Sequence, residues 1–172
     1  GVSGKAHALS FRLERGEFPE IPVPWLRMIA DVNAERDAKG AHQYGCEKSS
    51  GDWRDIINDP TIDVVSITTP NTLHKEMALA AIAAGKHVHC EKPLSPTLRD
   101  SEEMMKAAEA KGMTTQVGFN YIKNLIMKVA RDMIASGELG EITGFAGIPA
   151  EDYMLEPAAP LTCRMRPSGC PG

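Results

Sequence analysis

Short continuous runs of apolar residues alternate along the chain with stretches in which apolar residues recur every three or four positions. Two such runs cover Leu26–Val32 and Asp63–Thr68, and Lys86–Cys90 and Thr114–Phe119 are expected as two further strands. Runs of this length without polar alternation are typical of strands that are covered on both faces of a parallel sheet. The pattern therefore predicts four core strands.

Helical spacing appears after three of these runs. We expect one helix to end at Gly85, a second to begin at the N-cap and first-turn pair Ser95-Pro96 and run to Gly112, and a third to end at Gly137. The third has the most regular spacing and is predicted to lie with its apolar face on a sheet. The positions that define the first and third helices are Leu73, Met77, Ala80, Ala81 and Ala84, and Ile126, Val129, Ala130, Met133 and Ile134.

Strands and helices that alternate with short connections predict an α/β fold of the doubly wound Rossmann type, built on a parallel sheet. In such folds ligands bind outside the carboxyl ends of the strands. Candidate functional residues are therefore sought in the turns that follow the strands.

The first residues, Gly1-Val2-Ser3-Gly4, have the spacing of the last two glycines of a GxGxxG loop. In that loop the backbone approaches a pyrophosphate and a helix N-terminus points at it. Asp31 ends the first recognisable strand, where a carboxylate can accept hydrogen bonds from both adenosine ribose hydroxyls and repels a 2′-phosphate, which favours NAD over NADP. Each feature taken alone also fits an ordinary turn. We attribute the long separation between them to an inserted loop over Arg15–Pro24.

Polar residues follow the next two strands. Thr69-Pro70-Asn71 emerges at the sheet edge, and Asn71 can also cap the helix that carries His74. In Glu91-Lys92-Pro93 the lysine can place its ammonium against a substrate hydroxyl or a developing alkoxide. The following proline permits a cis peptide bond that would aim the lysine. An exposed charge pair at a strand end is the alternative.

Composition narrows the possible partners. The chain has 172 residues and a formal net charge of −4, and its lysines and arginines form no basic stripe, which argues against nucleic acid as a partner. No apolar stretch reaches the roughly 20 residues of a membrane span. No signal peptide opens the chain, and the four cysteines lack zinc or disulfide spacing, so we expect a cytoplasmic protein with free thiols. His87 and His89 share one strand face, but we interpret them as strand histidines and predict no metal site.

In order and spacing, the glycine loop, Thr69-Pro70-Asn71 with His74, and Ala84–Pro93 resemble the Gfo/Idh/MocA family of glucose-fructose oxidoreductase and inositol dehydrogenase relatives. The resemblance continues through Val117–Tyr121 and Ser136–Ile142 and into Glu151–Met154. It implies a dinucleotide-binding Rossmann domain over residues 1–120 and the start of a second α/β domain over 121–172. It also implies an oxidoreductase that transfers hydride between a sugar, cyclitol or related polyol and a nicotinamide cofactor, with homo-oligomers among full-length relatives.

Carried over residue by residue, the resemblance makes Lys92 the catalytic lysine and places Tyr121 and Lys123 at the substrate. It implies NAD or NADP at the first domain, and Asp31 makes NAD the expected cofactor; no metal is expected. The residues that it implies as cofactor contacts are Gly1, Ser3, Gly4, Asp31, Thr69, Pro70, Asn71, His74, Glu91 and Arg164.

The departures from the family pattern carry expectations of their own. The first strand of the Rossmann sheet and the first glycine of its loop would precede Gly1, so the two strands that normally flank that first strand are expected to have unpaired edges. Cys163 stands where relatives have tryptophan, and the helix with the proton-accepting histidine would follow the chain. We therefore expect this chain, taken alone, to be inactive. A non-catalytic dinucleotide-binding or regulatory protein of the same fold and an NAD-dependent glycoside hydrolase remain alternatives.

Overall fold

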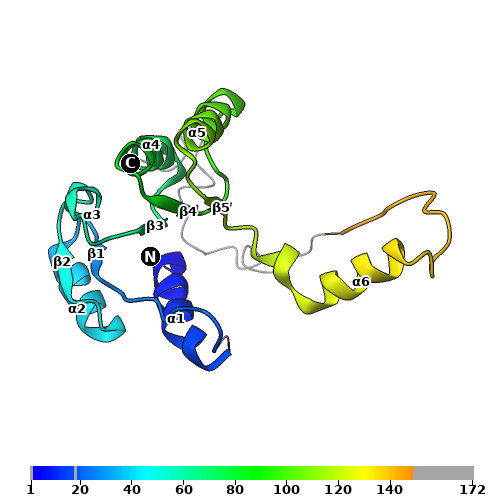
Figure 1. The fold of residues 1–172 in the computed structure, drawn as a ribbon, viewed down its shortest axis with the longest axis horizontal. Coiled ribbons are helices and arrows are strands. Elements are labelled where there is room, and N and C mark those ends of the chain that lie inside the picture. The colour runs from blue at the N-terminus through cyan, green and yellow to red at the C-terminus, as the bar shows by residue number, and fades with distance from the viewer. Residues whose placement is uncertain (1, 18, 149–172) are drawn as a thin grey trace, which may run out of the picture. The chain divides into compact units, whose positions relative to one another are not determined.

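The computed structural model describes residues 2–17 and 19–148. These residues divide into two compact units, and the boundary along the chain falls between Gly118 and Phe119. The first unit holds every described strand (Figure 1). Its elements are α1 (Val2–Glu17), β1 (Met28–Ala30), α2 (Ala34–Tyr44), β2 (Lys48–Ser50), α3 (Arg54–Asn58), β3 (Val64–Ile67), the 3-10 helix η1 (Asn71–Leu73), α4 (His74–Ala83), β4 (His87–Cys90), α5 (Leu98–Lys111) and β5 (Thr115–Val117). The second unit contains the 3-10 helix η2 (Asn120–Lys123) and α6 (Leu125–Ala135).

All strand pairing in the described residues is parallel, which confirms the predicted α/β class. β1 pairs with β2, and β3, β4 and β5 form a separate sheet in that order. Among residues 2–17 and 19–148, no strand pairs with the second edge of β1 or of β3. These are the two edges that the sequence predicted to be unpaired.

The core lies between the β3–β4–β5 sheet and the helices α4 and α5, which lie side by side in Figure 1. Apolar side chains are buried there because alternate strand residues face the helices. Ala78 and Ala81 let α4 approach the sheet closely, and Ile67, Val88 and Cys90 face it from the strands. Burial raises the pKa of the Cys90 thiol to about 12, so this cysteine is an apolar core residue.

Glycines end two helices in this unit. Gly85 follows α4 with φ +76° and Gly112 follows α5 with φ +66°, a left-handed conformation that glycine adopts without a side-chain clash. Both predicted stops are confirmed. The predicted loop over Arg15–Pro24 was wrong in its first part, since α1 continues to Glu17.

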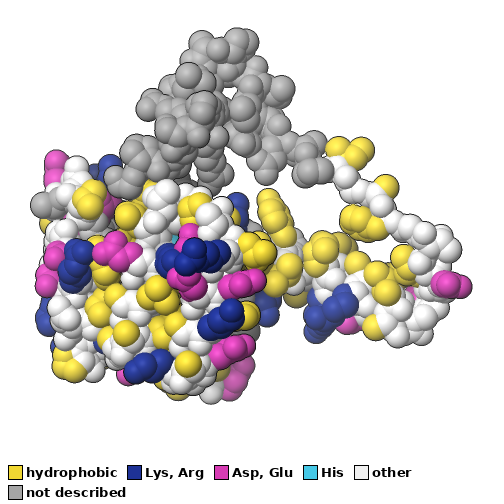
Figure 2. All heavy atoms as spheres, turned by 90° about the horizontal axis from the view of Figure 1, so that it is seen from above, with side chains coloured by type: hydrophobic (Ala, Val, Ile, Leu, Met, Phe, Trp, Pro, Cys, Tyr) yellow, Lys and Arg dark blue, Asp and Glu magenta, His cyan; other side chains and the backbone are white. Residues whose placement is uncertain are grey.

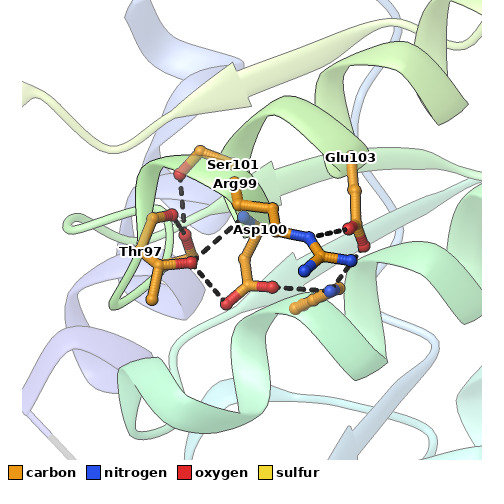
Figure 3. A network of polar contacts seen from close by, with 7 residues as sticks. Thr97, Arg99, Asp100, Ser101 and Glu103 are labelled. Carbon is orange, nitrogen blue, oxygen red and sulfur yellow. Dashed lines mark hydrogen bonds and ion pairs between the residues drawn. The ribbon is translucent and has the colours of Figure 1, made fainter.

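The start of α5 also differs from the prediction. Thr97 is the N-cap: its hydroxyl accepts the Asp100 N–H at 3.1 Å, whereas Ser95 bonds to the Thr97 carbonyl and to the Ser101 hydroxyl (Figure 3). The backbone is still extended at Thr97 (φ −127°, ψ 149°), so the helix begins at Leu98, after the Ser95-Pro96 pair. Lys75 on α4 lies 2.5 Å from carboxylate oxygens of both Asp100 and Glu103. These ion pairs fasten α4 to α5.

A buried lysine ties β4 to the loop before β3. The Lys86 ammonium donates to the backbone carbonyl oxygens of Asp59 and Ile62, each at 2.7 Å. The Asp59 carboxylate accepts from the hydroxyl and N–H of Thr61 and pairs with Lys48 at 3.3 Å. The hydrogen bonds from Thr61, with a smaller contribution from Lys48, lower the pKa of Asp59 to about 2.

In the second unit, α6 confirms the predicted helix, which is followed by Gly137 in a left-handed conformation. Figure 2 shows hydrophobic side chains along this segment, and Ile126, Val129 and Ile134 are exposed. No strand is described in this unit, so the expectation that the helix lies on a sheet is not met among the described residues. No described helix combines the length and apolar character that crossing a membrane requires.

The unpaired edge of β3 makes a hydrogen-exchange prediction. The backbone carbonyls of Asp63 and Ile67 point toward β4, and by alternation the carbonyl of Val65 does too. The carbonyl and N–H groups of Val64 and Ser66 therefore point to the other edge of β3. We expect the amides of Val64 and Ser66 to exchange faster than those of Val65 and Ile67. Residue-resolved exchange of the 172-residue chain measures this. Equal protection of the two pairs would show that this edge is covered.

The Asp59 cluster makes a prediction for stability against pH. The pKa of Asp59 in the folded state lies below its usual value of 3.8. The ionised carboxylate therefore stabilises the fold at pH values above 3.8, and this stabilisation is lost as the pH falls toward about 2. We expect Asp59→Asn to lower the free energy of unfolding at neutral pH and to match the unmodified protein at the acid end. Urea unfolding across this range measures the difference. Asp63→Asn, an exposed carboxylate nearby, is the control and should have a smaller effect.

Candidate functional site

The turns after β3 and β4 lie side by side because their strands pair in register. Ile67 is the partner of Cys90, and the Glu91 N–H donates to the Ile67 carbonyl at 2.9 Å. The polar residues that follow Ile67 and those that follow Cys90 therefore emerge at the same edge of the sheet, as the predicted topology requires.

The first turn of α1 reaches this edge. A Cβ added at Gly4 would lie 3.1 Å from the Thr68 hydroxyl oxygen, so the helix backbone approaches the end of β3 at a distance that a side chain would obstruct. Ser3 is half-buried beside it. A helix N-terminus carries partial positive charge and free N–H groups, which suit an anionic ligand. Gly1 lies outside the described residues.

Asp31 follows β1 directly. One carboxylate oxygen accepts the Asn33 N–H at 3.0 Å, and the other lies 3.6 Å from an Arg36 guanidinium nitrogen. Asn33 in turn caps α2 by accepting the Arg36 N–H at 2.9 Å. The carboxylate is thus held at the strand end while part of it remains exposed.

A groove lies between the unpaired edges of β1 and β3, at the position of the first strand in the predicted sheet, and α1 contributes Gly4 and His7 to its wall. Asp31 and Arg36 lie on the β1 side, and Thr68 lies on the β3 side. The predicted pyrophosphate and ribose contacts therefore line one continuous surface.

His74 fastens the turn after β3 to the turn after β4. The ring is 1% exposed, with one nitrogen 2.9 Å from the Thr69 carbonyl and the other 3.0 Å from the Pro93 carbonyl. Both ring nitrogens therefore lie within hydrogen-bond distance of backbone carbonyls. Its predicted role as a direct cofactor contact stays a prediction.

Asn71 does not cap α4, contrary to the prediction. It begins η1, and the residue at the N-cap of α4 is Leu73, which makes no side-chain cap. The helical geometry starts at η1, so Asn71 lies a full turn too early for the cap. Asn71 and Pro70 nevertheless sit at the sheet edge with Thr69, whose hydroxyl contacts the Met77 sulfur at 3.5 Å.

Glu91 is more constrained than the sequence suggested. His7 on α1 lies 3.0 Å from one carboxylate oxygen, and its other ring nitrogen lies 2.6 Å from the Ser66 hydroxyl. The His7 ring stacks on His89 with centroids 4.6 Å apart. Gly118 has to be glycine here, since a Cβ would lie 2.9 Å from the same Glu91 oxygen.

Lys92 itself is exposed at this edge. Its N–H lies 3.2 Å from the second Glu91 carboxylate oxygen, and the Lys92–Pro93 peptide bond is cis. The ammonium is therefore presented by a short segment, the Lys92 turn (Glu91–Pro93), which is fixed on one side by Glu91 and on the other by Pro93.

Three other predicted site residues lie outside the described part of the first unit. Tyr121 and Lys123 lie in η2 of the second unit, where both are exposed, and Arg164 lies outside the described residues. In residues 2–17 and 19–148 no group of three His, Cys, Asp or Glu side chains is arranged to hold a metal ion. His87 and His89 do share a strand face, and His87 accepts the Thr114 N–H at 3.0 Å.

Sequence reasoning missed His7, Ser66 and Gly118 as members of the site. His7 stands three residues after Gly4, the last residue of the glycine motif. This closeness to the motif is the one signal in the sequence that pointed to His7. Ser66 and Gly118 are unremarkable in sequence, because their importance comes from the close approach of distant segments.

Comparison with known proteins places these features in a family. Residues 1–119 match the GFO_IDH_MocA oxidoreductase family, described as having an NAD-binding Rossmann fold. The chain is 41% identical to levoglucosan dehydrogenase of Pseudarthrobacter phenanthrenivorans over 169 residues, 98% of this chain and 43% of that protein. It is 36% identical to inositol 2-dehydrogenase of Salmonella typhimurium over 117 residues, 66% of this chain and 34% of that protein.

The structure agrees with the sequence comparison. A levoglucosan dehydrogenase solved in complex with NADH and levoglucosan superposes with a TM-score of 0.93 and 40% identity, over 98% of this chain and 46% of that one. The chain thus spans less than half the length of these relatives. With its family match, its parallel strands and its Lys92 turn, the chain belongs to the Gfo/Idh/MocA family of oxidoreductases.

Proposed function

We propose that this chain is the cofactor-binding part of an NAD-dependent dehydrogenase that oxidises a sugar, a cyclitol or a related polyol. The observation that carries the proposal is the Lys92 turn, which presents an exposed ammonium at the sheet edge where the predicted cofactor contacts converge. The names of two relatives, levoglucosan dehydrogenase and inositol 2-dehydrogenase, support this substrate class.

The described residues suit NAD. Ser3 and Gly4 would supply N–H donors for a pyrophosphate at the first turn of α1, where the helix backbone lies close to Thr68. Asp31 would accept hydrogen bonds from the adenosine ribose hydroxyls. Thr69, Pro70 and Asn71 would line the path from the ribose toward the Lys92 turn. When bound, NAD supplies the carbon that accepts the hydride.

Lys92 would act on the substrate hydroxyl. Oxidation of a secondary alcohol removes a hydride from carbon and a proton from oxygen, and negative charge builds on the oxygen as the proton leaves. An ammonium held against that oxygen stabilises the charge, a contribution of the kind that makes positioned acids and bases effective. Tyr121 and Lys123 would bind the remaining hydroxyls of the substrate.

The choice between NAD and NADP would depend on Asp31 and Arg36. The carboxylate repels a 2′-phosphate and also lies 3.6 Å from the Arg36 guanidinium, the group best suited to bind one. Arg36 remains largely exposed, with 63% of its side chain accessible. Removal of Asp31 would therefore take away the repulsion and release a phosphate-binding cation together.

The first prediction for this site concerns Lys92. In a full-length protein that contains these 172 residues, we expect Lys92→Met to lower kcat by about 10²- to 10⁴-fold, because the developing alkoxide loses its cation, with little change in the Kd for NADH. Absorbance of NADH at increasing levoglucosan and myo-inositol measures kcat, and nicotinamide fluorescence measures Kd. Lys106→Met, an exposed lysine on α5, is the matched control. A variant with undiminished kcat would remove Lys92 from the catalytic role.

The same assay on the unmodified protein separates the remaining alternatives. Binding of NADH without oxidation of any sugar or cyclitol would support a non-catalytic dinucleotide-binding protein. Assay of the 172-residue chain alone tests whether it is inactive. Sustained NADH production by that chain would contradict the expectation of inactivity.

A second prediction concerns cofactor choice. We expect Asp31→Ser to weaken NADH binding by about 10- to 100-fold, since hydrogen bonds to a charged acceptor are lost, and to strengthen NADPH binding. Fluorescence titrations with the two cofactors measure both constants. Asp52→Ser changes an exposed carboxylate far along the chain and should alter neither. Equal weakening of both cofactors would show that Asp31 only supports the fold.

A further inference from the structure

A carboxylate, an imidazole and a hydroxyl from three separate segments form a continuous array behind the Lys92 turn. Ser66 comes from β3, His7 from α1 and Glu91 from the turn after β4. The Nδ1 atom of His7 lies 2.6 Å from the Ser66 hydroxyl oxygen, and its Nε2 atom lies 3.0 Å from a Glu91 carboxylate oxygen. We propose that His7 is a positioning residue that holds Glu91 and, through Glu91, aligns Lys92 for hydride transfer. The inference rests on the proposed function of Lys92.

The chemistry of the partners fixes the proton on His7. An ionised carboxylate can only accept hydrogen bonds, so the ring nitrogen that faces Glu91, Nε2, has to carry the hydrogen. In the neutral ring Nδ1 then accepts from the Ser66 hydroxyl, which is free to donate. The bond to Glu91 is charge-assisted, which makes it stronger than a neutral one.

The position of the His7 ring is itself restricted. Its side chain is 14% exposed, and the ring lies nearly parallel to His89, 4.6 Å away. Burial, and next the nearby His7, lower the pKa of His89, while Glu91 opposes them. A neutral His89 stacks on His7 without like-charge repulsion. Ser66 and His89 together therefore keep the His7 donor aimed at Glu91.

Glu91 passes this restraint to Lys92. One carboxylate oxygen accepts from His7, and the other accepts the Lys92 N–H at 3.2 Å. The glutamate side chain is 20% exposed and is packed against Gly118. Without His7 a largely buried carboxylate would lose its donor and would have to turn toward water, which costs free energy and moves the segment that carries Lys92.

The same helix also carries the predicted pyrophosphate contacts. His7 lies three residues beyond Gly4, about one turn of α1. A rigid helix that contacts the cofactor with its first turn and Glu91 with its second would hold Glu91 at a fixed position relative to the cofactor. His7 thus aligns Lys92 with respect to the cofactor as well as to the sheet.

The test compares two substitutions of His7 in the purified protein. His7→Phe keeps the ring and its stacking on His89 but donates nothing, whereas His7→Gln places an amide N–H near the position of Nε2. We expect His7→Phe to lower kcat for levoglucosan or myo-inositol by about 10- to 100-fold, with KM for NAD and Kd for NADH changed less than about threefold. His7→Gln should recover most of the loss. His42→Phe, an exposed histidine on α2, is the control.

The outcomes separate positioning from a purely structural role. Equal loss of kcat in His7→Phe and His7→Gln, or an unchanged kcat in His7→Phe, would overturn the proposal. Loss of NADH binding in parallel with kcat would do the same, because it would indicate a general defect of α1.

A spectroscopic measurement needs no activity. We expect ¹⁵N spectra of the histidine rings to show a slowly exchanging hydrogen on Nε2 of His7, lost in Glu91→Met, which has no oxygen acceptor. A ring protonated on Nδ1 alone would contradict the inference even if the enzyme were active. If a full-length protein that contains these 172 residues oxidises no substrate while this signature is present, the proposed function fails and the His7–Glu91 bond stands.

Discussion

Parallel pairing of β3 with β4 is the constraint on which the candidate site depends. Because the strands run in the same direction and Ile67 is opposite Cys90, the residues that follow them leave the sheet at one edge. Lys92 and Glu91 belong to the second of those turns, and the two histidines that hold this segment, His7 and His74, contact Glu91 and Pro93 in it. A shift in this register would separate His74 from Pro93 and His7 from Glu91 at once.

The two histidines explain how a short exposed turn is held in place. His74 is buried on α4 and bonds the backbone on both sides of the sheet edge, while His7 reaches over from α1 to the Glu91 carboxylate. Lys92 stands between these two attachments. An ammonium on a flexible stem loses conformational freedom when it acts, so a fixed backbone beneath it reduces that cost.

The edges of β1 and β3 mark the other notable feature of the fold. The first unit contains two parallel sheets whose nearest strands are not paired with each other in the described residues, and the groove between them carries both α1 and Asp31 on its walls. The core of the unit is concentrated on the β3–β4–β5 side, where α4 and α5 are fastened by Lys75 and its two carboxylate partners.

Local chemistry determined much of what the sequence predicted. The apolar runs of the strands, the glycines after α4 and α5 and the spacing along α6 depend on neighbours within a few residues, so they identified those elements and the α/β class. The cap of α5 was predicted wrongly, because serine and threonine both cap helices and only the extended backbone at Thr97 shows which of Ser95 and Thr97 does so. Only the tertiary structure decided that His7 and Ser66 join Glu91 and that Gly118 makes room for it, since these contacts bridge 59 and 84 residues of chain and leave no periodic trace in the sequence.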